Sequence, residues 1–346
     1  MNATDRIYVG AKLLTTLRSQ WWPSQRIRDY QARNLVRMMR YAATRVPYYR
    51  RLRLNAENLV SAADLLRFPL VNKREIQREP EAFLAPDPAR VDAFSSRTSG
   101  SSGEPTTTYF DRRAWLLSKH ALKMRRVAMT AGLSLPKRVM IISEQTPEEL
   151  HRGAHLAGIK RDLLFGRRRL SIHTAVDEHV EEIERYRPHV IYAFPSYLLD
   201  LIGAAERLGR GLPQIATLCT SSEVLTPATR ARIERAFGGR LYDVYGSTEF
   251  KEVAWQCRAG RYHTNFESVY VEPRPADTPA PVVLTTLCNL TMPLLRFDIG
   301  DQASFTDEPC PCGRAGQTMQ SFLGREGDTI ALPSGRRVSP YVLTTA

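Results

Sequence analysis

The sequence predicts an α/β fold, with a largely parallel sheet flanked by helices and a separate antiparallel β region. Between residues 174 and 245, helical and strand patterns alternate three times, which is typical of a parallel sheet covered by helices. After residue 265 the sequence contains only short strand patterns and turns. The 346 residues are 43% hydrophobic and 25% charged, as in soluble globular proteins. Such a length accommodates one large domain or two ordinary ones.

Residues 1 to about 60 are predicted to be helical. Leu35, Met38, Met39 and Ala42 recur at helical spacing. Pro47 should end that helix, because the residue before a proline is biased away from the helical region. The next stretch, FPLVNKREIQREP, favours a short helix with Asn72 as its N-cap.

The stretch RTSGSSGEPTTTYF, residues 97–110, is predicted to contain a loop that joins two strands, and a helical pattern over residues 112–131 follows it. Small hydroxyl residues and glycines suit a flexible linker, but they also suit a turn that wraps backbone around a phosphate. The common phosphate-binding loop carries a lysine, and this one has none. Phosphates would be held here by N–H groups freed by Gly100 and Gly103 and by side-chain hydroxyls. Those hydroxyls belong to Thr98, Ser99, Ser101 and Ser102. The charge would then have to be balanced by a metal ion on a carboxylate elsewhere.

The alternating region contains three predicted helices with local boundary signals. The first is VDEHVEEIERY, followed by the strand HVIYAF. The second begins with Ser196 as N-cap, ends at Gly209 and leads to the strand IATLCT. The third has Thr226 as N-cap, Pro227 at its first position and two glycines at its end, which is the usual order of helix start and stop signals.

The segment DVYGSTEF, residues 243–250, ends the last predicted parallel strand. Ligands of open α/β sheets bind at such strand ends. Tyr245 offers a flat face for a base, and Gly246 permits a tight turn. Thr248 can donate a hydrogen bond to a phosphate, and the Glu249 carboxylate can hold Mg²⁺. An ordinary strand-end turn would also fit this pattern.

Three of the five cysteines and one histidine form a candidate metal site. Cys257, His263, Cys310 and Cys312 have the donor set of a closed structural zinc site, although the spacing also allows buried thiols. Cys219 and Cys288 fall in predicted strands and are expected in the core. The other six histidines are expected on the surface or as hydrogen-bonded core residues.

The chain carries a formal net charge of +13 and a pI near 9.7. The basic residues are scattered and no nucleic-acid motif accompanies them. They indicate a solvated surface or attraction of anionic substrates, and no nucleic-acid partner is predicted. No apolar stretch approaches the roughly 20 residues of a membrane span. Charged residues near the N-terminus, such as Asp5 and Lys12, argue against a secretory signal, so a cytoplasmic location is expected.

Four motifs together resemble the adenylate-forming superfamily, which includes acyl-CoA ligases, peptide-synthetase adenylation domains and luciferases. They are TSGSSGEPT, YGSTE, RFDIGD (296–301) and GREGD (324–328), in the order and spacing of that superfamily. The stretch LTPATRARIERAFG is similar to the phenylacetate–CoA ligase and capsule-associated branch. The resemblance implies the large N-terminal core of such an enzyme. Its expected parts are a helical segment 1–60, an α/β nucleotide-binding core 61–265, a β-rich subdomain with a zinc knuckle 266–323, and a hinge with the start of a C-terminal domain 324–346.

The resemblance implies a ligase that activates a carboxylic acid with ATP as an acyl-adenylate and transfers it to a thiol such as coenzyme A. The implied cofactors are ATP, Mg²⁺, a structural zinc ion and coenzyme A. A non-CoA acceptor, or a nucleotide-binding accessory protein without full catalysis, remains open. Residues 141–155 lack the aromatic, glycine-rich run of the phenylacetate enzymes, so the acid itself is not implied.

The resemblance also assigns roles to individual positions. The loop Thr98–Gly103 would embrace the β- and γ-phosphates, and Ser222 and Glu223 would border the adenine and the acyl pocket. Thr248 and Glu249 would be catalytic, touching the α-phosphate and Mg²⁺. The remaining implied contacts are Tyr245 on adenine, Gly246 and Ser247 in the same nucleotide segment, Asp301 on the ribose, Arg325 near the hinge, and Phe194 and Tyr197 in the acyl pocket or in helix packing.

Two departures from the family pattern affect these expectations. Position 327 is Gly where the hinge motif has Asp, so only Asp328 remains. The sequence also ends at Ala346, before the C-terminal domain that carries a lysine for adenylation. The chain is therefore expected to be truncated, to bind nucleotide and to catalyse poorly.

Overall fold

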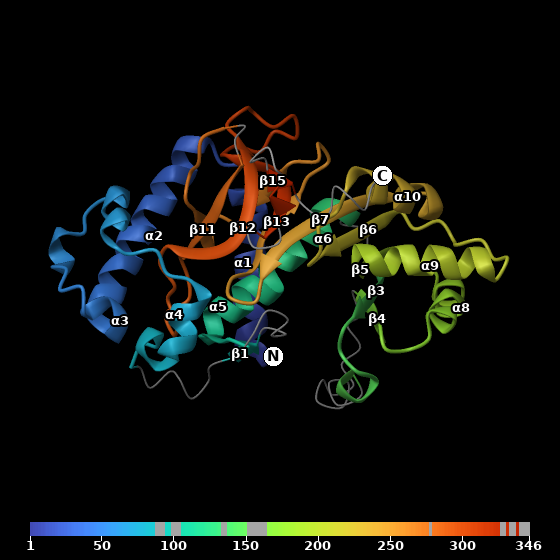
Figure 1. Ribbon diagram of the computed structural model, residues 1–346, viewed down its shortest axis with the longest axis horizontal. Coiled ribbons are helices and arrows are strands. Elements are labelled where there is room, and N and C mark those ends of the chain that lie inside the picture. The colour runs from blue at the N-terminus through green and yellow to red at the C-terminus, as the bar shows by residue number, and fades with distance from the viewer. Residues whose placement is uncertain are drawn as a thin grey trace. The chain divides into compact units, whose positions relative to one another are not determined.

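The computed structural model describes residues 1–86, 94–97, 105–132, 137–150, 165–276, 279–325, 330–331 and 337–338. These residues form two compact units (Figure 1). Unit 1 combines Met1–Arg126 with Gly246–Ser339, and unit 2 contains Val127–Tyr245. The two units do not follow the four segments expected from the sequence, and that division stays a prediction.

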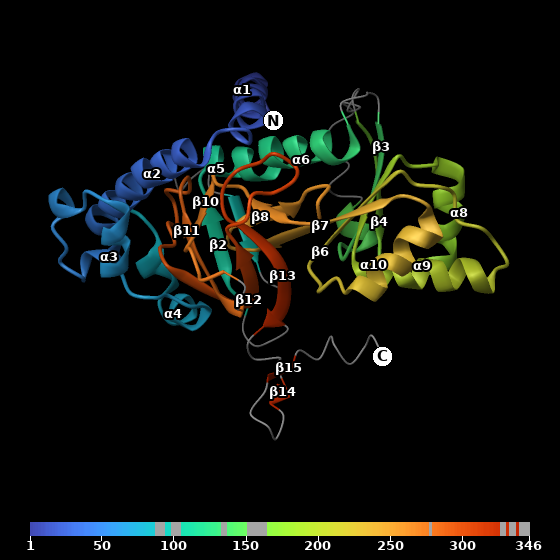
Figure 2. The ribbon, with the colours of Figure 1, turned by 90° about the horizontal axis from the view of Figure 1, so that it is seen from above.

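Unit 2 contains the predicted parallel sheet. Its strands are ordered β7-β6-β5-β3-β4, and each neighbouring pair is parallel. The strands are β3 (Lys137–Ser143), β4 (Phe165–Ser171), β5 (Val190–Ala193), β6 (Thr217–Ser221) and β7 (Arg240–Ser247). The helices between them are α8 (Val176–Tyr186), α9 (Pro195–Arg207) and α10 (Pro227–Phe237), and Figure 2 shows these helices gathered beside the strands.

Side chains of successive residues in β3 enter different cores, as the two-residue period of a strand requires. Met140 and Ile142 pack with Leu198 and Ile233 from the helices on one face. Val139 and Ile141 join a smaller cluster on the other face. The apolar residues of β3 therefore pack on both faces of the sheet, whereas residues 166–169 of the edge strand β4 are exposed.

Unit 1 contains the predicted antiparallel region. Its main strands are ordered β10-β11-β12-β13-β9-β8, with antiparallel neighbours. They are β8 (Lys251–Gln256), β9 (Tyr262–Thr264), β10 (Val269–Val271), β11 (Pro279–Thr286), β12 (Phe297–Thr306) and β13 (Thr318–Arg325). Two short hairpins pair β1 (Phe94–Arg97) with β2 (Thr107–Phe110), and β14 (Ile330–Ala331) with β15 (Arg337–Val338).

The N-terminal half of unit 1 is helical, as the sequence predicts. Its helices are α1 (Ala3–Ser19), α2 (Ser24–Arg45), α3 (Pro47–Arg50), α4 (Lys73–Arg78), α5 (Arg112–Leu116) and α6 (Leu122–Ala131), with 3₁₀ turns at Ala56–Asn58, Ala62–Arg67 and Pro80–Phe83. Asn72 caps α4 in a capping box, and Val46 leaves the helical region before Pro47. The pattern over residues 112–131 predicts one helix, but a π-helical turn at Leu117–Ala121 separates α5 from α6.

Contacts between distant parts of the sequence hold unit 1 together. The Tyr49 hydroxyl accepts a hydrogen bond from the Leu295 N–H at 2.9 Å. The Asn289 amide donates to the Tyr109 carbonyl at 2.8 Å. The Asp5 carboxylate pairs with Arg112 through two hydrogen bonds of 2.8 and 2.9 Å. The helical half and the β half therefore share one folded body.

Among the described residues, no helix has the length and apolar character to cross a membrane.

Candidate functional site

The predicted phosphate loop lies between two strands, as the sequence indicates. β1 and β2 pair antiparallel, with Arg97 opposite Thr107 at the end of the ladder. The loop residues Thr98, Ser99, Gly100, Ser101, Ser102 and Gly103 lie outside the described residues, so their role stays a prediction. The base of the hairpin is aromatic, because Phe94 stacks on Trp115 with ring centroids 5.0 Å apart and Phe110 meets Trp115 edge-on. This cluster fixes both strands that lead into the loop.

The segment from Tyr245 to Glu249 runs from the end of β7 into a turn at residues 248–250. Within unit 1, a Cβ on Gly246 would lie 2.4 Å from the Lys251 carbonyl oxygen, closer than real side chains approach backbone. Only glycine fits there, in agreement with the tight turn that the sequence indicates. The Ser247 hydroxyl accepts a hydrogen bond from the Phe250 N–H at 3.1 Å. The turn that carries Thr248 and Glu249 is therefore closed by local contacts.

Glu249 and Lys251 form the charged part of this turn. The Glu249 carboxyl is buried, with 8% of the residue exposed, and a buried carboxylate requires a cation nearby. The Lys251 ammonium lies 4.7 Å from the centroid of Phe110 and 5.4 Å from that of Trp115. Burial and then the charge of Lys119 lower the pKa of Lys251 to about 7, against the opposing effect of Glu249. Lys251 was missed in the sequence, since nothing local marks its position against the hairpin aromatics.

In unit 2, polar side chains gather where β5 and β6 end. Tyr192 and Ser221 are hydrogen-bonded through their hydroxyl groups at 2.5 Å. Ser222 has a φ of +74°, a left-handed conformation that is uncommon for a residue with a side chain and often marks functional sites. Glu223 follows it and accepts two hydrogen bonds from Ser196, at 2.9 Å from the N–H and 2.7 Å from the hydroxyl. The predicted residues Ser222 and Glu223 thus lie at the carboxyl ends of parallel strands, where ligands of such sheets bind.

The Glu223 contact corrects one expectation about α9. Ser196 is not the N-cap, because the helix begins at Pro195 with Phe194 as the cap residue. Proline suits the first helical position, since its fixed φ is helical and its missing N–H needs no partner. The Ser196 side chain is consequently available to Glu223.

Phe194 and Tyr197 both contact the core of unit 2. Phe194 is partly buried against that core, and Tyr197 is part of it. The Tyr197 hydroxyl and the His179 Nδ1 lie 2.6 Å apart in a buried hydrogen bond. This contact joins Tyr197 of α9 to α8, and it makes His179 the hydrogen-bonded core histidine that the sequence predicts. A role of Phe194 and Tyr197 in the acyl pocket stays a prediction.

Asp301 and Arg325 come from distant motifs and meet across two strands. Asp301 in β12 is the direct partner of Arg325 in β13. Gly300, before Asp301, has a φ of +81° and donates its N–H to the Asp298 carboxylate at 2.9 Å. The end of RFDIGD and the residue after it are therefore paired with the first two residues of GREGD within unit 1.

The four predicted metal ligands are brought together in unit 1. The ligand atoms of Cys257, His263, Cys310 and Cys312 all lie within 4.8 Å of one another. The Cys257 and Cys310 sulfurs are 3.6 Å apart, and the Cys312 sulfur is 3.3 Å from the His263 Nε2. Zn–S bonds of about 2.3 Å and Zn–N bonds of about 2.0 Å in a tetrahedron require S···S and S···N separations of roughly 3.5–3.8 Å. The arrangement fits a tetrahedral ion of this size.

Two tight turns position these ligands. The β8–β9 hairpin carries Cys257 and His263, and the Gly260 N–H closes its turn on the Cys257 carbonyl at 3.0 Å. In the loop between β12 and β13, the Gly313 N–H bonds to the Cys310 carbonyl at 3.0 Å. The pairing of β13 with β9 then sets the two turns side by side.

The groups of the cluster differ in protonation: the neutral His263 and the lowered pKa of Cys312 suit a metal, whereas Cys310 would have to lose a proton on binding one. Burial, followed by the charges of Arg314, Arg125 and Arg261, lowers the pKa of His263 to about 3, so the imidazole is neutral. Burial raises the pKa of Cys310 to about 12. For Cys312, burial acts in the opposite direction to hydrogen bonds from the Arg314 backbone and side chain, which leave its pKa lowered. The Arg314 guanidinium lies 3.5 Å from the Cys312 sulfur and was not predicted as part of the cluster.

The other two cysteines differ from each other. Cys219 is buried in β6, as predicted. Cys288 is not in a strand, because β11 ends at Thr286 and Cys288 lies in the bend after it. It packs against the core cluster of Val9, Leu116 and Leu122. Its predicted contact with the core is therefore observed, but its predicted place in a strand is not.

Comparison with known proteins gives a consistent result. No family model matches the chain. The chain is 27% identical over 332 residues to the phenylacetate-coenzyme A ligase of Thermus thermophilus, which covers 90% of this chain and 73% of that protein. It is 24% identical over 333 residues to the phenylacetate-coenzyme A ligase of Aromatoleum evansii, covering 88% of this chain and 72% of that protein.

Solved structures share the fold. The structure of 2-hydroxyisobutyryl-CoA ligase in complex with 2-HIB-AMP superposes with a TM-score of 0.78 at 20% identity, covering 94% of this chain and 73% of that one. The same enzyme with 2-HIB-AMP and CoA gives a TM-score of 0.74 at 22% identity, covering 93% of this chain and 72% of that one. The four motifs, the α/β fold and the similarity along nearly the whole sequence agree, and the chain is similar to phenylacetate-coenzyme A ligases in sequence and to a CoA ligase in fold.

Proposed function

We propose that this protein is an AMP-forming ligase that activates a carboxylic acid with ATP and transfers the acyl group to the thiol of coenzyme A. The observation that carries the proposal is the similarity to phenylacetate-coenzyme A ligase over 90% of the chain. The fold likeness to a CoA ligase with an acyl-adenylate and CoA is in keeping with both half-reactions.

In the first half-reaction the acid carboxylate attacks the α-phosphate of ATP, giving an acyl-adenylate and pyrophosphate. Such a reaction needs two anions held in line and donors placed at the developing charge. We assign the phosphates to the loop Thr98–Gly103 and the α-phosphate to Thr248. Tyr245 would stack on adenine, and Gly246 and Ser247 would shape the same turn.

We assign the remaining nucleotide contacts to the paired motifs and to the strand ends of unit 2. Asp301 would accept hydrogen bonds from the ribose hydroxyls, with Arg325 opposite it across the ladder. Ser222 and Glu223 would border the adenine and the acid, and Glu223 would be fixed by Ser196. In the second half-reaction the thiol attacks the acyl carbon and AMP leaves.

Glu249 would hold Mg²⁺ beside the phosphates. A buried carboxylate in a turn next to Thr248 suits a hard divalent cation, which prefers oxygen ligands. When bound, the ion would neutralise phosphate charge that the lysine-free loop leaves unbalanced.

The function is tested by pyrophosphate release with ATP, Mg²⁺ and a panel of phenylacetate, benzoate and 2-hydroxyisobutyrate, followed by mass analysis after coenzyme A is added. We expect pyrophosphate with at least one acid and the matching thioester with coenzyme A. Adenylate without thioester would favour another acceptor, and no nucleotide binding at all would contradict the proposal.

The Glu249 assignment has a matched control. Glu249→Gln should lower kcat/KM for Mg·ATP by about 10²-fold or more and weaken Mg·ATP binding. Glu206→Gln on the exposed surface of α9 should change neither quantity. If both variants had the same kcat/KM for Mg·ATP and the same affinity for Mg·ATP, the assignment of Glu249 to the site would be wrong.

We further propose that Cys257, His263, Cys310 and Cys312 hold a structural zinc ion. Metal analysis should find about one zinc per chain, and Cys310→Ser should lose it. Cys219→Ser is the matched control, because Cys219 is buried in the other unit. Unchanged zinc content in Cys310→Ser would contradict the site.

A further inference from the structure

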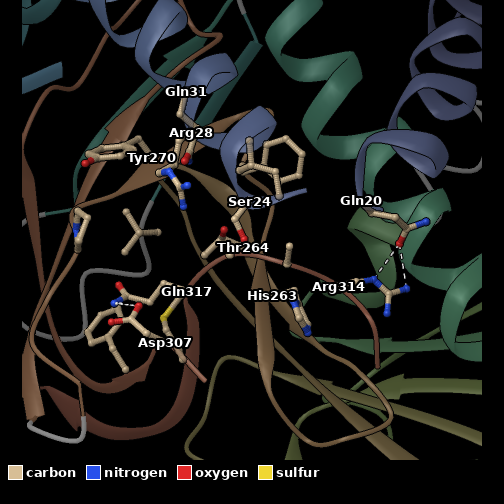
Figure 3. Close-up of a pocket in the computed structure, with 18 of the residues that line it drawn as sticks. Gln20, Ser24, Arg28, Gln31, His263, Thr264, Tyr270, Asp307, Arg314 and Gln317 are labelled. Atoms are coloured by element: carbon tan, nitrogen blue, oxygen red, sulfur yellow. Dashed lines mark hydrogen bonds between the residues drawn. The ribbon is translucent and has the colours of Figure 1, made fainter. Parts of the chain in front are cut away.

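A cavity of about 390 Å³ lies within unit 1, between α2 and the antiparallel strands. Figure 3 shows Ser24, Arg28 and Gln31 on α2, with Thr264 and Gln317 across the cavity from them. Among the described residues, none of those assigned to the nucleotide site lines this cavity. It is therefore separate from the nucleotide site, but it borders the metal cluster, because His263 and Arg314 also line it.

The walls of the cavity suit an apolar body. Leu35, Phe266, Phe305 and Met319 line it, and all four are buried core residues. Cavities of this volume are in the range that takes up small organic molecules, with mostly apolar walls and a few placed polar groups. The size and the walls together indicate a ligand with an aromatic or aliphatic part.

The charged groups of the lining favour an anion. Three arginines line the cavity, against one aspartate: Arg28, Arg125, Arg314 and Asp307. Arg125 is paired with Glu267 at 2.7 Å, and the Asp307 carboxylate accepts a hydrogen bond from Gln317 at 2.9 Å. Arg314 donates to the side-chain Oε1 of Gln20 at 2.9 and 3.1 Å.

Arg28 differs from these arginines. It donates to the Gln25 side chain at 2.6 Å, and no ion pair of the described part of the chain includes it. Its charge is therefore available to an anion in the cavity.

Two buried lining residues also carry N–H groups without a hydrogen-bond partner. These are the Trp255 Nε1 and the Arg125 Nε, on side chains that are 2% and 1% exposed. Buried donors are nearly always paired in folded proteins, because an unpaired one loses its hydration without compensation. A ligand with an acceptor atom in this cavity would give these N–H groups a hydrogen-bond partner.

We propose that the cavity is a second binding site, which takes a small organic anion with an apolar body, such as an aryl or alkyl carboxylate. The apolar part lies against Phe266, Phe305 and Met319. The carboxylate lies toward Arg28 and accepts from the unpaired donors. The proposal does not depend on the ligase activity, because no residue of the nucleotide site takes part.

The test uses the intact protein with ¹³C-methyl-labelled methionine, with 3-phenylpropionate as the probe. Of the eight methionines, Met319 lines the cavity, and Met319→Leu assigns its signal. We expect the Met319 signal to shift saturably, with a dissociation constant below about 10 mM, a range in which weak ligands are measurable. The neutral analogue 3-phenylpropionamide should bind at least about 10-fold more weakly, as expected for loss of a charged hydrogen bond.

Matched variants on α2 locate the binding. Arg28→Gln should weaken 3-phenylpropionate binding at least about 10-fold, whereas Arg33→Gln, an exposed change on the same helix, should leave it unchanged. Ala32→Phe should block binding by filling the cavity, with the other methionine signals confirming that the variant is folded. Glu249→Gln should leave the Met319 titration unchanged, which separates this site from the acid site of the ligase.

Three results would overturn the proposal. The first is a Met319 signal that does not move. The second is equal binding of the acid and the amide, which would remove the anion specificity. The third is an unchanged titration in folded Ala32→Phe or in Arg28→Gln, which would place the probe elsewhere.

Discussion

Unit 1 and unit 2 bury charge in different ways. In unit 1, Arg125 pairs with Glu267 and Arg126 with Glu252, and none of the four side chains is more than 9% exposed. In unit 2, the pair between Arg207 and Asp177 has side chains that are 63% and 48% exposed. The two core clusters of unit 2 are apolar, although Lys137 and Asp243 are also buried in this unit.

This difference in buried charge follows from which stretches of the chain form each unit. The described residues of unit 2 all come from the stretch 127–245, whose helices pack on neighbouring strands through local αβ connections. Unit 1 joins two stretches on either side of it, and Arg125 lies 142 residues from Glu267. A buried charge is stable only beside its oppositely charged partner, whereas an apolar side chain can pack against many others. We therefore infer that the buried ion pairs favour the correct pairing of the two stretches of unit 1.

The largest expected effect tests the buried pair. Arg125→Met removes one partner and leaves Glu267 buried without a cation, which should lower the free energy of unfolding by about 3–5 kcal/mol. Denaturant unfolding followed by tryptophan fluorescence measures it, because all four tryptophans, at positions 21, 22, 115 and 255, lie in unit 1.

The control for Arg125→Met is Arg207→Met, which breaks an exposed pair in unit 2. Exposed pairs contribute about 0–1 kcal/mol, so this variant should be close to wild type. If both variants lost the same stability, the contrast between buried and exposed charge would be wrong.

The apolar core of unit 2 gives the next largest effect. Leu198 is fully buried in α9, and Leu198→Ala should cost about 2–5 kcal/mol through lost burial and the cavity left behind. Circular dichroism should show an earlier transition. Because unit 2 contains no tryptophan, an unchanged fluorescence transition would indicate that the units unfold separately, and a joint shift would contradict independent stability.

The buried hydrogen bond between Tyr197 and His179 should matter less. Tyr197→Phe leaves the His179 nitrogen without its partner, at a cost of about 1–2 kcal/mol by the same circular dichroism measurement. Arg210→Gln, on an exposed side chain of the same unit, should have little effect. A Tyr197→Phe protein as stable as wild type would show that this contact is replaceable.

The same pair predicts a pH dependence. Burial lowers the pKa of His179, so the unfolded state binds more protons below the ordinary value of about 6.5. The free energy of unfolding should therefore fall as the pH falls below about 6.5. His179→Gln should flatten this part of the profile, and an unaltered slope would assign it to other groups.

The smallest effects compare one helix cap in each unit. Asn72 caps α4 in unit 1, and Thr226 caps α10 in unit 2. Replacing either by Ala should cost about 1 kcal/mol, with Asn72→Ala visible by fluorescence and Thr226→Ala by circular dichroism. A much larger loss at Asn72 would indicate that α4 supports more of unit 1 than its own first turn.

Local signals in the sequence were sufficient to predict most of the helices and strands of unit 2. The helical pattern at Val176–Tyr186 matches α8, and Thr226, Pro227 and Gly238 mark the ends of α10 as predicted. These features depend on residues within one or two turns of each other. Ser196 was misassigned because Pro195 occupies the first helical position and Phe194 is the cap residue, whereas the side-chain partner of Ser196, Glu223, lies 27 residues away.

The candidate sites were predictable in composition but not in geometry. The sequence shows the Cys and His donors, while the distances between them depend on the pairing of β9 with β13. The contact of Lys251 with Phe110 and that of Arg314 with Gln20 join segments that no local pattern connects. The cavity beside α2 could not be predicted from the sequence either, because its walls come from separate parts of unit 1.

The divided sequence of unit 1 has a consequence for synthesis on the ribosome. At about 5–20 residues per second, Arg125 is made roughly 7 to 30 s before Glu267. During that interval unit 2 is completed and has all its strands available, while the helices of unit 1 still lack the strands that cover them. We therefore expect the nascent N-terminal helices to expose apolar surface, with Arg125 made before its partner Glu267, and to be the part of this protein that chaperones bind during translation.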